Sequence, residues 1–150
     1  MQTSKRTLLR GMAALGALAV LPRAALAAVW PTAAFSSTAA KQAMTELLGT
    51  DQTTPSDQIV LRIPEIAENG AVVPVSVSTT LENVESISVV VKKNPRPLVA
   101  NFEMLPGTLP DVSCRIKMGE TSDVMAVVKT GSGIYSTSKE VKVTIGGCGG

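Results

Sequence analysis

Hydrophobic and polar residues alternate along most of the chain after residue 58. In several stretches apolar residues, mostly valine and isoleucine, occupy every second position, with mainly serine, threonine and charged residues between them. A period of two is typical of antiparallel strands that bury one face and expose the other. The pattern predicts strands at 59–63, 72–79, 84–92, 98–104, 112–118, 123–129 and 138–145. Seven short strands, separated by turn sequences, predict an all-β, immunoglobulin-like sandwich in a single domain.

A helical period precedes these strands. Residues 38–48 place five apolar side chains on one helical face, with Ser37 as the expected N-cap and Gly49 just beyond the end. The face consists of Ala40, Ala43, Met44, Leu47 and Leu48. The sequence therefore predicts one short helix before the sandwich.

Pro74 interrupts an otherwise regular strand. Proline cannot donate a hydrogen bond to a neighbouring strand, so we expect this strand to lie at a sheet edge or to be bulged. An exposed edge could receive a second β subunit, and an edge that is protected without any partner is an equally good interpretation.

The first 27 residues read as an export signal. Lys5, Arg6 and Arg10 precede an uncharged apolar run at 11–21, and Ala25-Leu26-Ala27 predicts cleavage before Ala28. The apolar run is too short to span a membrane as a helix. The segment 4–9 resembles a twin-arginine signal with Lys5 in place of the first arginine, and a general secretory signal also fits. We expect a periplasmic protein in an oxidising compartment.

Composition excludes several classes of site. The chain has 150 residues, no histidine and two cysteines, which rules out histidine-based triads, imidazole metal ligands and a four-cysteine zinc site. Its net charge of +2 becomes −2 without the four cations of the signal. With only four aromatic residues, this composition argues against nucleic acid as a partner and against a membrane once the signal is removed. We expect no cofactor in this chain.

The chain ends in a cysteine placed between two pairs of glycines. Cys148 is flanked by Gly146, Gly147, Gly149 and Gly150, which carry no side chain that could bury apolar surface. We therefore expect a flexible arm that carries a thiol. Nothing near Cys148 in the sequence activates that thiol, so it suits covalent attachment of cargo better than catalysis. The expected organisation is a signal at 1–27, a helical segment at 28–57, the sandwich at 58–145 and the arm at 146–150.

Two other interpretations of Cys148 stay open. It could be an incidental cysteine in a tail, or it could form a disulfide with Cys114 in the oxidising compartment. Cys114 is in phase with Val112, Ile116 and Met118, which favours a structural position facing the core.

Several motifs resemble the SoxY family, the sulfur carriers of bacterial thiosulfate oxidation. The C-terminal residues 141–150 are similar to the ending of that family. The resemblance continues through 64–70, 73–75, 84–87, Asn94-Pro95 with Pro97, and 115–118. It implies a non-enzymatic carrier in which Cys148 holds pathway intermediates. It also implies SoxZ as the heterodimer partner and SoxAX, SoxB and a sulfane dehydrogenase as transient partners, with haem and metals confined to those enzymes.

Two other classes of function compete with a covalent carrier. A ubiquitin-like sulfur carrier also ends in Gly-Gly, but its terminal carboxylate needs cytosolic ATP, which disagrees with the export signal and the strand pattern. A structural or chaperone-like sandwich that pairs through an edge strand would leave the terminal motif unused. The sequence does not show which sulfur intermediates are bound, whether the dehydrogenase takes part, or the oligomeric state.

Overall fold

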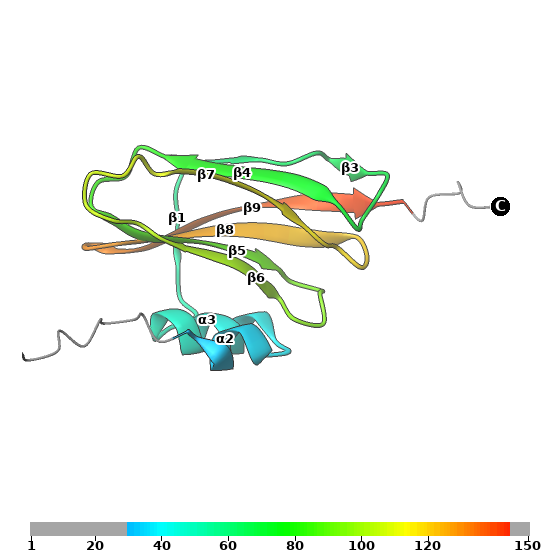
Figure 1. Ribbon diagram of the computed structural model, residues 1–150, viewed down its shortest axis with the longest axis horizontal. Coiled ribbons are helices and arrows are strands. Elements are labelled where there is room, and N and C mark those ends of the chain that lie inside the picture. Colours follow the sequence, from blue (N-terminus) through cyan, green and yellow to red (C-terminus); the bar gives the residue numbers. More distant parts are fainter. Residues whose placement is uncertain (1–29, 145–150) are drawn as a thin grey trace, which may run out of the picture. The chain divides into compact units, whose positions relative to one another are not determined.

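The computed structural model describes residues 30–144, and the unit that begins at Pro31 contains a β-sandwich with two helices (Figure 1). The predicted signal at 1–27 and the predicted arm at 146–150 lie outside the described residues. The elements are α2 (Thr32–Ser36), α3 (Ala40–Leu48), β1 (Thr54–Pro55), β2 (Ile59–Arg62), β3 (Ile66–Ala67), β4 (Val73–Thr79), β5 (Val84–Val91), β6 (Leu98–Glu103), β7 (Asp111–Ile116), β8 (Ser122–Thr130) and β9 (Gly133–Val143).

Two sheets form the sandwich. The larger sheet has the strand order β1-β9-β8-β5-β6, and β3 pairs with β9 beside this path. The smaller sheet has the order β2-β4-β7 and is antiparallel throughout. All seven predicted strands are present in the described residues, and the predicted all-β sandwich is confirmed.

The core between the sheets consists mainly of valine and isoleucine. Side chains at alternate positions of β4, β5 and β8 point into it, and most of them are fully buried. This is the alternation that the sequence showed, and burial of each such side chain contributes about 1.5–3 kcal/mol before entropy losses. The most buried members are Val73, Val77, Ile87, Val91, Val124, Val128 and Val141.

The two helices pack on the outer face of the larger sheet, opposite the smaller sheet (Figure 1). Ala43 and Met44 of α3 and Ala34 of α2 contact Val90 and Val127 in a second apolar cluster. The predicted apolar face of the helix is thus confirmed, and the left-handed Gly49 ends α3 as expected (φ +82°).

The predicted N-cap of this helix is wrong. Ala39 occupies the N-cap of α3 and makes no side-chain capping bond. Ser37 instead follows α2, a one-turn helix that the sequence pattern did not indicate. Its hydroxyl donates to the carbonyl of Ala33 at 2.9 Å. The capping residue was therefore assigned to the wrong helix end.

The prediction that Pro74 marks an edge strand is also wrong, since β4 is the central strand of the smaller sheet. Pro74 pairs with Arg115 of β7 on one side. On the other side, the ladder with β2 ends at Ser76, which pairs with Arg62. The strand is central, but the position of Pro74 lies beyond the end of β2, so no β2 carbonyl is paired opposite its missing donor.

Two short parallel bridges flank the long strand β9. β1 pairs with the beginning of β9, at Tyr135 and Ser136, and β3 pairs with its end, at Lys142 and Val143. β9 itself begins at Gly133, five residues before the predicted start of the strand. This strand leads directly toward the predicted arm, so the way its end is held determines where the arm starts.

Candidate functional site

The residues predicted to hold cargo lie outside the described residues. These are Cys148 and the four glycines Gly146, Gly147, Gly149 and Gly150. The structure does describe the residues Lys142–Thr144 that lead toward them, which we call the root of the arm. Four sequence steps separate Thr144 from Cys148, so an extended chain could carry the thiol at most about 14 Å from the root.

The short strand β3 holds one side of the root. The backbone N–H of Lys142 donates to the carbonyl of Glu65 at 2.9 Å, and the N–H of Thr144 donates to the carbonyl of Ala67 at 3.1 Å. Ala67 is buried in the core, which fixes β3 against the sandwich. The root is therefore hydrogen-bonded to a segment that is itself anchored.

A side chain holds the other side of the root. β8 begins at Ser122, opposite Val141, so no residue of β8 is available to pair with Val143. The hydroxyl of Thr121, one residue before β8, accepts the N–H of Val143 at 3.0 Å. Thr121 thus supplies the acceptor that a longer strand would have supplied.

Gly70 permits a close approach behind the root. Its carbonyl accepts the N–H of Met118 at 2.7 Å. A Cβ at this position would lie 2.5 Å from the carbonyl oxygen of Met118 and 2.9 Å from Cγ1 of Val143. Only glycine fits here without displacing backbone, because real Cβ atoms do not approach that closely.

Asn94 holds the loop that contains Met118. Its Nδ2 donates to the carbonyl of Lys117 at 2.7 Å, and its Oδ1 accepts the N–H of Gly119 at 3.2 Å. The side chain thereby bridges the turn after β5 to the loop between β7 and β8. We call Gly70, Asn94, Met118 and Thr121, together with β3, the clamp.

The clamp brings together motifs that are far apart in the sequence. The segments 64–70, Asn94-Pro95 and 115–118 all contribute to it, and each had been noted for a family resemblance. At the same end, Figure 1 shows β3 beside the end of β9 and the loop between β7 and β8 close by. Sequence reasoning listed these motifs but did not place them around the root, because hydrogen bonds between distant loops leave no periodic signal.

A shallow groove of about 390 Å³ lies beside β3 and the second half of β9. It is lined by Glu65, Ile66, Lys139, Glu140 and Lys142. Its two acidic and two basic side chains leave no excess of either charge, and Ile66 exposes more than half of its surface. The groove thus offers no concentrated charge that would select an anion or a cation.

Cys114 lies in β7, partly buried and packed against the main core. Burial raises the pKa of its thiol, so the reactive thiolate forms less readily than on an exposed cysteine. The prediction that Cys114 faces the core is confirmed. The alternative of a Cys114–Cys148 disulfide involves a residue outside the described range.

Two further observations concern residues 30–144. No group of three or more Cys, Asp or Glu side chains among them is arranged to hold a metal ion. No helix in that range is long and apolar enough to cross a membrane.

The fold and the clamp together define an immunoglobulin-like β-sandwich whose last strand is fixed at one end of the body. The chain belongs to the SoxY family: the family described as "Sulfur oxidation protein SoxY" matches residues 44–148, a range that includes Cys148. The resemblance noted in the sequence is thereby confirmed. No curated protein matched in a separate search.

One solved structure agrees with this assignment, and others share the fold. The sulfur carrier protein SoxY from Chlorobium limicola f thiosulfatophilum is 41% identical, with a TM-score of 0.63, and the match covers 69% of this chain and 94% of that one. The superoxide reductase (neelaredoxin) from Ignicoccus hospitalis is 18% identical, with a TM-score of 0.55 and coverage of 61% and 95%. A single-site variant of that reductase, also 18% identical, gives a TM-score of 0.53 and coverage of 58% and 80%. At such low identity the two reductase structures show a shared fold alone.

Proposed function

We propose that this protein is a covalent sulfur carrier in thiosulfate oxidation, with Cys148 as the attachment site. The observation that carries the proposal is a family match that extends to Cys148, together with a strand that is clamped immediately before the Gly-Gly-Cys-Gly-Gly ending. A body that fixes the strand and a glycine-rich ending that carries one thiol suit the transfer of cargo between enzymes. The carrier does not catalyse the reactions itself.

The chemistry proposed at Cys148 begins with two steps, oxidative loading of thiosulfate and hydrolysis of the sulfonate. In the first, a disulfide bond forms between Sγ and the outer sulfur of thiosulfate, the thiol proton is released, and two electrons pass to the haem cytochrome SoxAX. In the second, SoxB uses water to cleave the bond to the sulfonate group, which leaves as sulfate, while a persulfide stays on the cysteine. A sulfane dehydrogenase would then oxidise the outer sulfur of the persulfide to a sulfonate: three water molecules supply the oxygen, protons are released, and six electrons pass to the dehydrogenase. The haem and metals belong to these partners.

We further propose export to the periplasm and pairing with SoxZ. The export signal at 1–27 supports the first, because it has a basic region, an apolar run and a cleavage motif in order. Covalent attachment would keep a small sulfur intermediate at high effective concentration near the next enzyme. Binding to SoxZ rests on the family resemblance.

The decisive measurement is the intact mass of the mature chain after incubation with thiosulfate and a periplasmic extract of the source organism. We expect mass additions that correspond to bound sulfur species, and we expect Cys148→Ser to abolish them. Cys114→Ala is the matched control, because it removes the other cysteine from a partly buried position, and it should keep the additions.

Three outcomes would contradict the proposal. Additions that persist in Cys148→Ser would place the cargo elsewhere. A chain lacking residues 146–150 that still supports thiosulfate oxidation would favour a structural sandwich. A thiocarboxylate at Gly150 would instead indicate the ubiquitin-like chemistry.

A further inference from the structure

The root of the arm is held although its neighbouring strand has ended. β8 pairs with β9 only as far as Val141, and Lys142 and Val143 continue beyond it. Strand ends that outlast their partner are usually the first residues to open. Here each of the next three backbone N–H groups has an acceptor: Glu65 for Lys142, Thr121 for Val143 and Ala67 for Thr144.

Burial of apolar surface accounts for only part of this arrangement. Val141 is fully buried and Val143 packs against the same core while partly exposed, but the side chains of Lys142 and Thr144 are exposed. The core is therefore nearly complete at Val141. The hydrogen bonds beyond Val141 fix the position of residues that add little to the core. The close contact between Gly70 and Met118 and the side-chain bridge of Asn94 hold the neighbouring loop that supports these bonds.

We propose that the clamp sets the reach of Cys148 by fixing where the carrier arm begins, with Thr121 and Asn94 as positioning residues; this rests on the carrier function proposed above. Opening the clamp would free the three residues of the root and lengthen the tether by about 10 Å. A longer tether dilutes the thiol around a fixed target, whereas a shorter one fails to reach it. The clamp thus keeps constant the number of residues that can extend between the sandwich and Cys148.

The test compares two double variants that loosen opposite ends of β9. Thr121→Val with Asn94→Ala removes the side-chain bonds of the clamp. Thr53→Val with Thr130→Val removes bonds at the beginning of β9, where Thr53 Oγ1 lies 2.8 Å from Ser136 Oγ and Thr130 Oγ1 bonds to Gly133. Each pair deletes two side chains that form hydrogen bonds at or near one end of β9, and the conservative Thr121→Ser should behave like the parent chain.

Hydrogen exchange gives the first readout. The amides of Val143 and Thr144 should exchange about a hundredfold faster in the clamp variant, at roughly tenfold for each lost bonding group. In the matched variant they should stay within about threefold of the parent chain, because the deleted bonds lie at the far end of β9 and distant sites act almost independently. Equal acceleration in both variants would mean a general loss of stability and would overturn the proposal.

Arm length gives the second readout. Deleting Gly147 shortens the tether by about 3.5 Å and should slow the loading of Cys148 by partner enzymes about tenfold. When the clamp variant is combined with the Gly147 deletion, the freed root residues can extend the tether. Loading of Cys148 should then reach at least about a third of the rate of the chain with the full-length arm. The matched variant should recover none.

The two proposals fail in different ways. If full-length Cys148 is loaded but the shortened chain is not rescued by opening the clamp, the clamp has no role in reach and the inference is wrong. If the full-length chain acquires no sulfur at Cys148 under any condition, the carrier function itself fails, and the role of the clamp in reach fails with it.

Discussion

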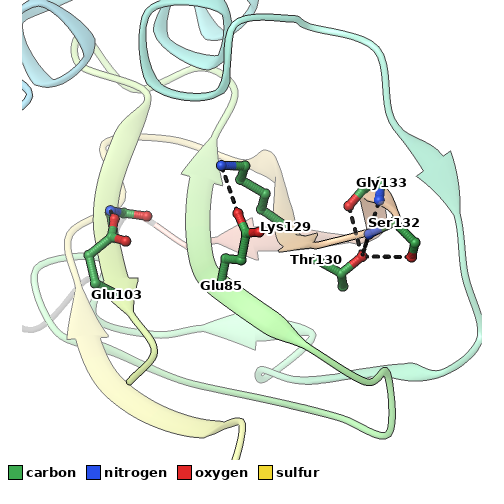
Figure 2. A network of polar contacts seen from close by, with 7 residues as sticks. Glu85, Glu103, Lys129, Thr130, Ser132 and Gly133 are labelled. Carbon is green, nitrogen blue, oxygen red and sulfur yellow. Dashed lines mark hydrogen bonds and ion pairs between the residues drawn. The ribbon is translucent and has the colours of Figure 1, made fainter. Parts of the chain in front are cut away.

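The side chain that closes the β8–β9 hairpin and the side chains that hold the root of the arm bridge different distances along the sequence. At the hairpin between β8 and β9, Thr130 Oγ1 accepts the N–H groups of Ser132 and Gly133 at 3.2 Å, as Figure 2 shows. All of these bonds join residues within three positions in the sequence. At the root end, Thr121 and Val143 are 22 residues apart, and Asn94 reaches residues 23 and 25 positions away.

The sequence separation of these hydrogen bonds determines which of them can form early in folding and which form late. A hairpin turn closes locally, and its bonds require only the residues of the turn. Bonds between distant loops form only after the chain entropy of closing those loops has been overcome by the rest of the fold. The clamp therefore depends on the completed sandwich, so Lys142–Thr144 are held in place only in the folded body.

The largest difference in stability between variants at the two ends should come from replacing a glycine with alanine. Gly70→Ala places a Cβ against the backbone of Met118 and should destabilise the protein by about 2–3 kcal/mol. Gly131→Ala, at the hairpin end, meets nothing closer than 3.9 Å and should change stability by less than about 0.5 kcal/mol. Urea denaturation of the two variants measures this directly. Equal losses would show that the close approach at Gly70 relaxes without cost.

An intermediate effect is expected from the side chains that hold each end. Asn94→Ala and Thr130→Val should each cost about 1–2 kcal/mol, because each leaves backbone groups without a partner. The distribution of the loss should differ. Amide exchange should speed up at Gly119 and Val143 in the first variant and at Ser132 and Gly133 in the second. If Asn94→Ala left Val143 protected, Asn94 would not contribute to the clamp.

The smallest effect is expected from the ion pair beside the hairpin. Lys129 Nζ lies 2.8 Å from Glu85 Oε2, and both side chains are more than 40% exposed. Figure 2 shows this ion pair. Water screens such a pair, so Lys129→Met should change the free energy of unfolding by less than about 1 kcal/mol. Urea denaturation of the parent chain and of Lys129→Met, each in high and in low salt, measures this change. A larger loss that salt does not reduce would point to packing by the lysine stem instead.

Sequence alone predicted the parts of the fold that have a period. The alternation of Val73, Val75 and Val77 is what a buried strand face requires, and all three are buried. The bridges β1 and β3 were missed because two residues cannot show a period. The first half of β9 was missed because the polar run 136–138 interrupts its apolar pattern.

The candidate site divides in the same way. Cys148 was predicted as the attachment site from composition and position, and this residue lies outside the described residues. The clamp could not be predicted, since Gly70 and Met118 meet only in the folded chain and neither residue type signals the other. The sequence Glu68-Asn69-Gly70 does indicate a turn, but a turn explains local geometry and not the contact with Val143.

The parallel bridge of β3 has a mechanical consequence for a protein that is pulled by its tail. Strand hydrogen bonds run across the strand axis, so tension applied along β9 at Thr144 acts on the bonds to Glu65, Ala67 and Thr121 sideways. Under sideways force these bonds share the strain and must break together, whereas a peeling force would open them one after another. A pull on Thr144 along β9 would therefore load these three bonds together and leave the sandwich behind them folded.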